Sequence, residues 1–148
     1  MEERSAAIAV IGAGTAGLAA VREARKTTDD VILVEAERYG TTCARVGCMP
    51  SKALIAAAST AENVRGAHRF GIAAAPPAVR GPDVMAHVRE LRDHFVSHVV
   101  ESVEEIPDRM RLAGRARFEG DGRLVVAREG GDVAVAAQRI VVATGSRP

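Results

Sequence analysis

The feature that most constrains the fold is a glycine-rich turn, residues 12–17 (Gly-Ala-Gly-Thr-Ala-Gly), set between an apolar run and a helix-forming segment. The apolar run at 6–11 suits a strand buried on both faces, and residues 18–26 are mostly good helix formers. A second apolar run follows at 31–35. A strand, a helix and a second strand in this order make a right-handed crossover. We therefore predict an α/β fold with a parallel sheet covered on both faces.

The turn fits the pattern G-x-G-x-x-G, in which each glycine has a physical task in a dinucleotide site. Gly12 permits the tight turn, Gly14 lets backbone N–H groups approach a pyrophosphate, and Gly17 lets helix and strand pack closely. The first N–H groups of the helix, at Thr15 and Ala16, then face the diphosphate. A turn that serves packing alone is the alternative. The flanking strand and helix favour dinucleotide binding.

An acidic residue, Glu35, closes the second apolar run, about 20 residues after the turn. A carboxylate at this place accepts hydrogen bonds from both hydroxyls of an adenosine ribose and repels a 2′-phosphate. A cofactor with a plain ribose, FAD or NAD, is therefore favoured. The neighbouring Ala36 is assigned to the same site.

Two helices are expected in the middle of the chain. The first covers residues 51–64, and its Ala-rich run at 53–61 predicts close helix packing. Residues 66–82 are expected to be irregular, and a second helix covers 83–105. Its apolar residues have the spacing of a core-facing stripe: Val84, Val88, Leu91, Phe95, Val99, Val103 and Ile106.

The last third of the chain is rich in β-forming residues. Runs at 109–118, 123–127 and 133–136 are separated by glycine-containing turns and predict a small antiparallel meander. A further strand, buried on both faces, is expected at 139–143.

Two cysteines, Cys43 and Cys48, have four residues between them. On an ideal helix this separation is roughly 7.5 Å along the axis, and cysteines whose Cα atoms lie more than about 7 Å apart are not bridged without backbone movement. Gly47 and Pro50 allow a distorted helix start that would bring the sulfurs together. Two unrelated buried thiols are the alternative. A structural zinc site is disfavoured because no third or fourth ligand accompanies the pair.

The surroundings of the thiols are basic. Arg45 lies between the cysteines and Lys52 follows them at the start of a predicted helix. Cations and a helix N-terminus favour the thiolate, so depressed thiol pKa values and a labile, exchangeable disulfide are expected.

The segment 40–52, G-T-T-C-A-R-V-G-C-M-P-S-K, resembles the redox-active disulfide segment G-G-T-C-x-N-V-G-C-x-P-S-K of the flavin-dependent pyridine nucleotide-disulfide oxidoreductases. The glycine turn, Glu35 and the sequence Ala143-Thr144-Gly145, similar to the A-T-G at the end of the family's flavin domain, agree with this resemblance. Within the family the segment is most similar to the dihydrolipoamide dehydrogenase branch. Thr41 in place of the second Gly and Arg45 in place of Asn depart from the pattern; the first restricts the backbone and the second adds a cation.

The resemblance implies a Rossmann-like FAD-binding domain. Cys48 would lie nearer the flavin, Cys43 would exchange with the substrate, and Lys52 would sit near the flavin's reactive nitrogen. The residues implied to hold the cofactor are Gly12, Gly14, Thr15, Ala16, Gly17, Glu35, Ala36, Thr42, Cys43, Lys52, Arg115, Ala116, Ala143, Thr144 and Gly145.

The implied activity passes electrons from a dithiol, a small molecule such as dihydrolipoamide or its lipoyl-domain form, through Cys43 and Cys48 and FAD to NAD. The family's nicotinamide and dimerisation domains do not fit in 148 residues. Residues 1–148 are therefore interpreted as the N-terminal FAD-binding part of a longer, homodimeric enzyme, inactive in turnover by itself. The alternatives are a glutathione or mercuric reductase-type enzyme using NADPH, and a stand-alone flavin or thiol redox module.

Charge and hydropathy argue against other partners. The net charge of +1 leaves no basic stripe for nucleic acid. No apolar run approaches the roughly 20 residues that span a bilayer, so a cytoplasmic protein without membrane contact is expected. The histidines of the second helix, His87, His94 and His98, lack an H-E-x-x-H pattern; they are interpreted as a solvated polar face, and no metal is predicted.

Overall fold

The computed structural model describes residues 1–146, so the last two residues of the predicted domain, Arg147 and Pro148, lie outside the described part. The chain forms two compact units. We call residues 1–41 together with those from 99 onward the sheet unit, and residues 42–98 the helical unit. The elements are β1 (Glu2–Ile11), α1 (Thr15–Ala24), β2 (Val31–Glu35), α2 (Thr42–Arg45), α3 (Cys48–Gly66), η1 (Ala67–Phe70), α4 (Gly81–Glu104), η2 (Asp108–Met110), β3 (Arg111–Ala113), β4 (Arg115–Gly120), β5 (Arg123–Ala127) and β6 (Val133–Val142).

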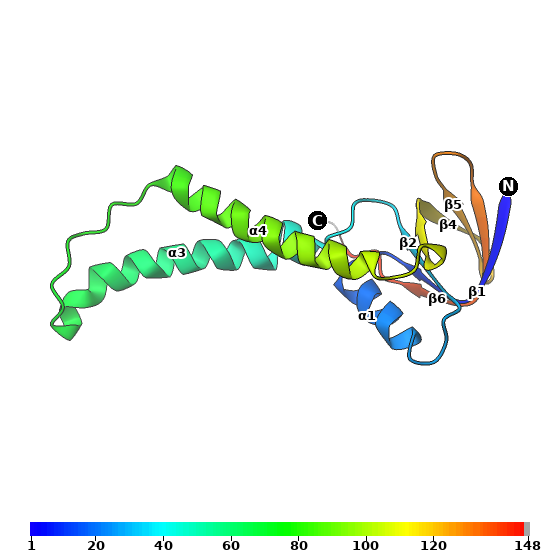
Figure 1. The fold of residues 1–148 in the computed structure, drawn as a ribbon, viewed down its shortest axis with the longest axis horizontal. Coiled ribbons are helices and arrows are strands. Elements are labelled where there is room, and N and C mark those ends of the chain that lie inside the picture. The colour runs from blue at the N-terminus through cyan, green and yellow to red at the C-terminus, as the bar shows by residue number, and fades with distance from the viewer. Residues whose placement is uncertain (147–148) are drawn as a thin grey trace. The chain divides into compact units, whose positions relative to one another are not determined.

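One six-stranded sheet forms the sheet unit, in the order β3-β2-β1-β6-β5-β4. The central strand β1 is parallel to both β2 and β6, and β3 is parallel to β2. On the other side of β6, β5 and β4 continue the sheet with antiparallel pairing. The sheet strands and α1 are seen in Figure 1. The predicted α/β class, with a parallel sheet and an antiparallel part, is confirmed.

The strand β6 differs from the prediction. The runs expected as two strands, 133–136 and 139–143, form one strand that pairs with β1 from Glu2↔Val133 to Ile11↔Val142. The first half of β6 also pairs with β5. The expectation that its last residues are fully buried is wrong, because the side chains of Val141 and Val142 are 38% and 59% exposed.

The run expected as a single strand at 109–118 is also divided. It contains the short helix η2, then β3 beside β2, and then β4 beside β5. The chain changes direction at Gly114, which has φ +152°. A Cβ there would lie 2.6 Å from the carbonyl oxygen of Ala127, so only glycine permits this close crossing.

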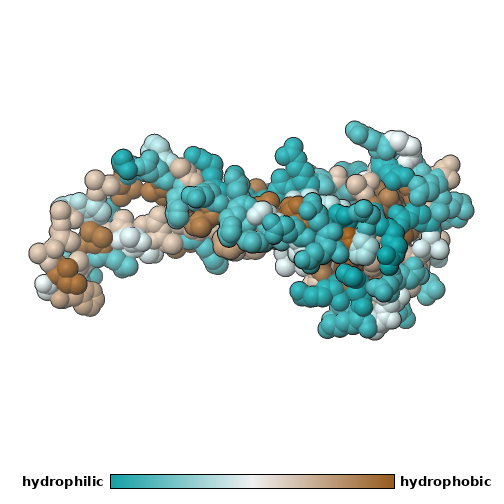
Figure 2. All heavy atoms as spheres, viewed as in Figure 1, coloured by the Kyte–Doolittle hydropathy of each residue, from teal (hydrophilic) through white to brown (hydrophobic). Residues whose placement is uncertain are grey.

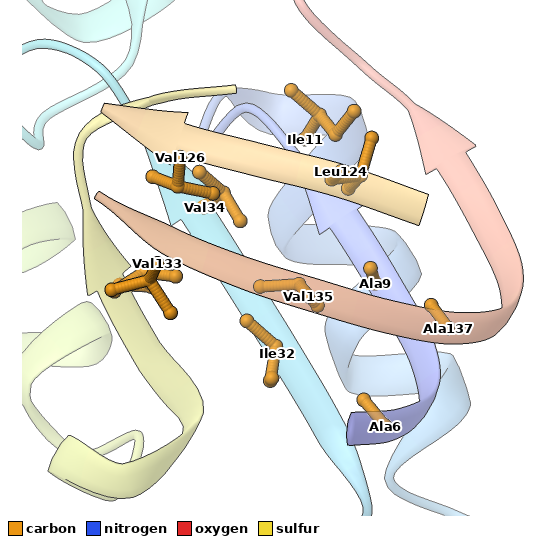
Figure 3. Packing of buried hydrophobic residues seen from close by; sticks show 11 residues of the cluster. Ala6, Ala9, Ile11, Ile32, Val34, Leu124, Val126, Val133, Val135 and Ala137 are labelled. Atoms are coloured by element: carbon orange, nitrogen blue, oxygen red, sulfur yellow. The ribbon is translucent and has the colours of Figure 1, made fainter. Parts of the chain in front are cut away.

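Both faces of the central strands are buried, which explains their continuous apolar sequence. Alternate residues enter two different cores. On one face, β1 and β2 meet side chains of β5 and β6, as Figure 3 shows for the labelled residues Ile11, Val34, Leu124 and Val126. On the other face, the second core joins Val10, Ala13, Val21, Val31, Leu33, Ile106 and Met110.

The helical unit is much less buried. No residue of α3 is buried, so the prediction of close packing for its Ala-rich run is wrong. Ala57, Ala61 and Val64 instead line a shallow depression of about 280 Å³ together with the segment that leads into α4. Of the predicted stripe on α4, Val88 and Val103 are buried but Phe95 is 37% exposed.

Apolar side chains reach the surface where residues 70–79 join α3 to α4. Phe70, Ile72 and Val79 are exposed there, and apolar residues are visible at this part of the helical unit in Figure 2. In residues 1–146 no helix has both the length and the hydropathy needed to cross a bilayer.

Candidate cofactor-binding turn and cysteine pair

The glycine turn between β1 and α1 is closed by backbone contacts that exclude side chains. Gly12 has φ +104°, and a Cβ on it would lie 2.4 Å from the carbonyl oxygen of Ala143. A Cβ on Gly17 would lie 1.8 Å from the carbonyl oxygen of Gly12. Both distances are shorter than any van der Waals contact, so these two positions require glycine for packing.

Gly14 has a different reason to be glycine. A Cβ on it would have no atom within 4 Å, and its φ of −77° is accessible to any residue. No other part of the described chain therefore fills the open space in front of the backbone of Gly14. No side chain caps the N-terminus of α1, and its first turn holds no acidic residue. This combination of open space and uncapped N–H groups at Thr15 and Ala16 fits a diphosphate.

The carboxylate of Glu35 connects the end of β2 to the turn. Its Oε2 accepts a hydrogen bond of 2.6 Å from the backbone N–H of Ala13, and its Oε1 accepts one of 2.9 Å from the N–H of Glu37. A carboxylate offers about four acceptor positions, so these two bonds leave capacity for ribose hydroxyls. The residue is half-buried, and its geometry fits the predicted role.

The end of β6 lies beside the glycine turn. The N–H of Ala143 donates a hydrogen bond of 2.8 Å to the carbonyl oxygen of Ile11. The Cα of Thr144 would lie 3.3 Å from a Cβ on Gly12, and Gly145 follows with φ +76°. The structure thus brings the predicted C-terminal cofactor residues next to the predicted N-terminal ones.

The predicted adenine contact is tied to the same edge of the sheet. The N–H of Gly114 donates a hydrogen bond of 2.9 Å to the carbonyl oxygen of Glu35. Arg115 and Ala116 follow directly at the start of β4, with Arg115 exposed and Ala116 half-buried. Ala36, after β2, is exposed.

The cysteine pair lies at a break between two helices of the helical unit. Cys43 is in the short helix α2, and Cys48 is the first residue of α3. Gly47 separates them with φ −116° and ψ −111°, well outside the helical region. The distorted helix start that the sequence allows at Gly47 is therefore present, in a structure where the two cysteines are not bonded.

Both cysteines are free thiols in this structure, Cys43 half-buried and Cys48 exposed. The side chain of Cys48 lies close enough to that of Cys43 to be the largest cause of the raised pKa of Cys43. The structure thus brings together the two residues predicted to be catalytic. Thr42 and Lys52, both exposed, flank them on α2 and α3.

The expectation of a depressed thiol pKa is wrong for Cys43. The hydrogen bond to Cys48 is the largest cause that raises the pKa of Cys43, and desolvation adds to it. The charge of Lys52 lowers this pKa but has a smaller effect. The partner thiol therefore outweighs the cation in setting the protonation of Cys43.

Sequence reasoning missed Tyr39 and Arg111. Tyr39 is half-buried beside the core of the sheet unit. Burial raises its pKa above the ordinary tyrosine value of 10.0, the charge of Arg111 opposes this rise, and the charge of Glu35 adds to it. The buried Nε of Arg111 has no hydrogen-bond partner within residues 1–146. No sequence motif marks these two residues. Arg111 lies on β3, and the sequence analysis did not distinguish this strand from β4 within the run at 109–118.

These geometries define the class: an α/β sheet with an open, glycine-rich turn after its central strand, in a chain that also holds two thiols close together. The chain belongs to the pyridine nucleotide-disulphide oxidoreductase family, whose model matches residues 6–148. Members of this family are oxidoreductases that use FAD and NAD(P), which confirms the predicted cofactor class.

Two curated relatives illustrate the match. A protein named dihydrolipoyl dehydrogenase 2 from Haloarcula marismortui is 37% identical over 145 residues, which are 94% of this chain and 30% of the relative. A mercuric reductase from Shigella flexneri is 37% identical over 145 residues, covering 95% of this chain and 26% of the relative. The chain therefore spans less than a third of the length of these proteins.

A solved structure has the same fold. The Cu(II) complex of the HOCl-induced flavoprotein disulfide reductase RclA from Escherichia coli superposes with a TM-score of 0.68 at 23% identity, over 96% of this chain and 29% of that one. This comparison supports the Rossmann-like assignment of the sheet.

Proposed function

We propose that the chain is the FAD-binding part of a flavoprotein disulfide oxidoreductase and that Cys43 and Cys48 are its redox-active pair. The observation that carries the proposal is the proximity of two thiols on either side of a helix break, in a chain whose glycine turn has open space in front of Gly14. A structural role for the cysteines would not require this contact between them.

The glycine turn would bind the FAD diphosphate through the backbone at Gly14, Thr15 and Ala16. Glu35 would orient the adenosine ribose with its free acceptor positions, and Arg115 and Ala116 would contact the adenine. Ala143, Thr144 and Gly145 would complete the site beside Gly12. Ala36 would lie next to the ribose, and Thr42 and Lys52 would contact the cofactor near the cysteines.

The chemistry of the cysteine pair is thiol–disulfide exchange. A substrate thiolate attacks Sγ of Cys43 in the oxidised pair, the Cys43–Cys48 bond breaks, and Cys48 leaves as a thiolate. The second substrate thiol then attacks the substrate sulfur of the mixed disulfide and releases Cys43. The substrate loses two electrons and two protons. The cysteine pair takes up the two electrons and one proton, on Cys43, and the other proton goes to solvent. FAD, when bound, would supply an acceptor for this electron pair.

The hydrogen bond in the reduced pair supports this division of roles. Cys43 keeps its proton to a higher pH because it is bonded to Cys48. Because its pKa is raised, Cys43 takes up a proton readily once the exchange has released it.

The substrate class is a dithiol such as dihydrolipoamide, free or on a lipoyl domain, with NAD as the electron acceptor. This finer proposal rests on the motif at 40–52 and on the similarity to dihydrolipoyl dehydrogenases. A mercuric reductase-type activity is the second candidate, because mercuric reductases match equally well. The full protein would be a homodimer. The 148-residue chain alone would accept electrons from the substrate but would not catalyse turnover.

The test is an FAD titration of the 148-residue chain, followed by absorbance and flavin fluorescence. We expect flavin binding, and on addition of one equivalent of dithiol we expect a long-wavelength absorbance band that is lost in Cys48→Ser. The matched control is Ser51→Ala, which removes a hydroxyl that donates a hydrogen bond to the carbonyl oxygen of Cys48 and should keep the band. A chain that folds but binds no flavin would contradict the proposal.

A further inference from the structure

Two histidines outside the proposed redox site converge on the surface of α4. The Nε2 atoms of His94 and His98 lie 3.3 Å apart, and their ring centroids are 4.5 Å apart with the rings nearly perpendicular. Both residues are exposed and lie within the helical unit. Their spacing of one helical turn places both rings on one face of a long, regular helix.

We propose that His94 and His98 form a binding site for a zinc ion, with water completing the coordination. Zinc is bound tetrahedrally with Zn–N distances of about 2.0–2.1 Å, which places two imidazole nitrogens ~3.3–3.4 Å apart. The separation in the structure equals this value. A square-planar cation such as Cu²⁺ would require neighbouring nitrogens only about 2.8 Å apart.

Each ring would coordinate zinc through its Nε2 atom, as a neutral imidazole does. The two Nε2 atoms already lie 3.3 Å apart on one face of the helix, so the geometry of the pair carries the proposal. Residues 1–146 hold no cluster of three or more ligating side chains, so this is a two-ligand, solvent-open site.

The experiment must separate this site from the thiols, which also bind zinc. We would use the full 148-residue chain with Cys43→Ser and Cys48→Ser, and follow a ZnCl₂ titration by NMR of the imidazole groups. The chain has four histidines, so the signals are resolved one by one. We expect the resonances of His94 and His98 to shift together with one binding constant, while those of His68 and His87 stay unchanged.

Variants test the assignment on the same background. His94→Gln and His98→Gln should each weaken zinc binding by about tenfold or more, since one of two ligands is lost. His87→Gln, an exposed histidine on the same helix, should leave the affinity unchanged. Circular dichroism checks that each variant folds. Zinc binding that survives both pair substitutions, or a titration that moves neither His94 nor His98, would overturn the proposal.

Discussion

The backbone N–H of Ala13 donates a 2.6 Å hydrogen bond to Oε2 of Glu35, so the glycine turn and the end of β2 are held together by one carboxylate. The residue proposed to bind the ribose thus also fixes the loop that is proposed to bind the diphosphate. A substitution of Glu35 would therefore change both cofactor binding and the stability of the chain. Other variants are needed to measure the two effects separately.

Gly14 and Gly17 provide this separation. Gly17→Ala places a Cβ 1.8 Å from a carbonyl oxygen, and we expect it to destabilise the chain by at least about 3 kcal/mol. Gly14→Ala meets no atom within 4 Å, so stability should change by less than about 0.5 kcal/mol while FAD affinity falls. Urea unfolding and flavin titration measure the two effects. Equal loss of stability in both variants would contradict the assignment.

Thr41 is the one non-glycine residue with positive φ in residues 1–146, at +50°. A β-branched residue in this region is strained, and the family pattern has glycine here. We expect Thr41→Gly to stabilise the chain by about 1 kcal/mol. Thr41→Ala keeps a Cβ and should gain much less. Thermal unfolding of the three proteins checks this, and a Thr41→Gly variant that is less stable than the parent would refute it.

Tyr39 can be titrated alone, because it is the only tyrosine and the chain has no tryptophan. Burial raises its pKa above 10.0, so absorbance at alkaline pH should show a midpoint above that of the unfolded chain. The folded pKa is the higher one. The associated stability is therefore present below the unfolded pKa of about 10 and is lost as pH rises through the folded value.

The charge of Glu35 contributes to this shift, so Glu35→Gln should bring the midpoint down. Glu37→Gln is the matched control, since the variant keeps the backbone N–H that donates a hydrogen bond to Oε1 of Glu35. A midpoint that is the same in the parent and in Glu35→Gln would show that the carboxylate does not act on Tyr39.

Cys43 should react with iodoacetamide more slowly at neutral pH than an ordinary thiol, because its pKa is raised. Cys48→Ala removes the hydrogen bond that is the largest cause, so the pH at half-maximal alkylation of Cys43 should fall. Lys52→Met should move it upward by a smaller amount. Mass spectrometry of the alkylated peptide measures the rates. An upward shift in Cys48→Ala would contradict the proposed contact.

Phe118 and Leu124 are cross-strand partners with opposite environments. Leu124 is fully buried, while Phe118 is 58% exposed on the edge strand β4. Leu124→Ala should cost about 2–5 kcal/mol, and Phe118→Ala should stay within about 0.5 kcal/mol. Denaturant unfolding compares them. Similar losses would mean that Phe118 is covered in the folded chain.

The elements that the sequence predicted well are those with a local cause. The strand at 31–35 and the turn at 12–17 follow from apolar continuity and from glycine spacing, and both lie where expected. The polar start of β1, Glu2–Ser5, was missed because its pairing partner is far along the chain at Val133–Ala136. Glu2 is held there by a 2.6 Å ion pair with Arg128.

The candidate site shows the same division. The broken helix between Cys43 and Cys48 followed from the glycine and proline nearby, which are local signals. The protonation of Cys43 did not follow, because counting nearby cations ignores the hydrogen bond between the two thiols. The proximity of Arg111 to Tyr39 could not be predicted for another reason. It arises from the pairing of β2 with β3, which brings together residues far apart in the sequence.

The long pairing of β1 with β6 also governs how the chain assembles. The register joins Glu2 to Val133 and Ile11 to Val142, so β1 completes its pairing only when residues 133–142 are available. Contacts between strands so far apart in the sequence slow folding. Until β6 is in place, one edge of β1 is open to pairing with other strands.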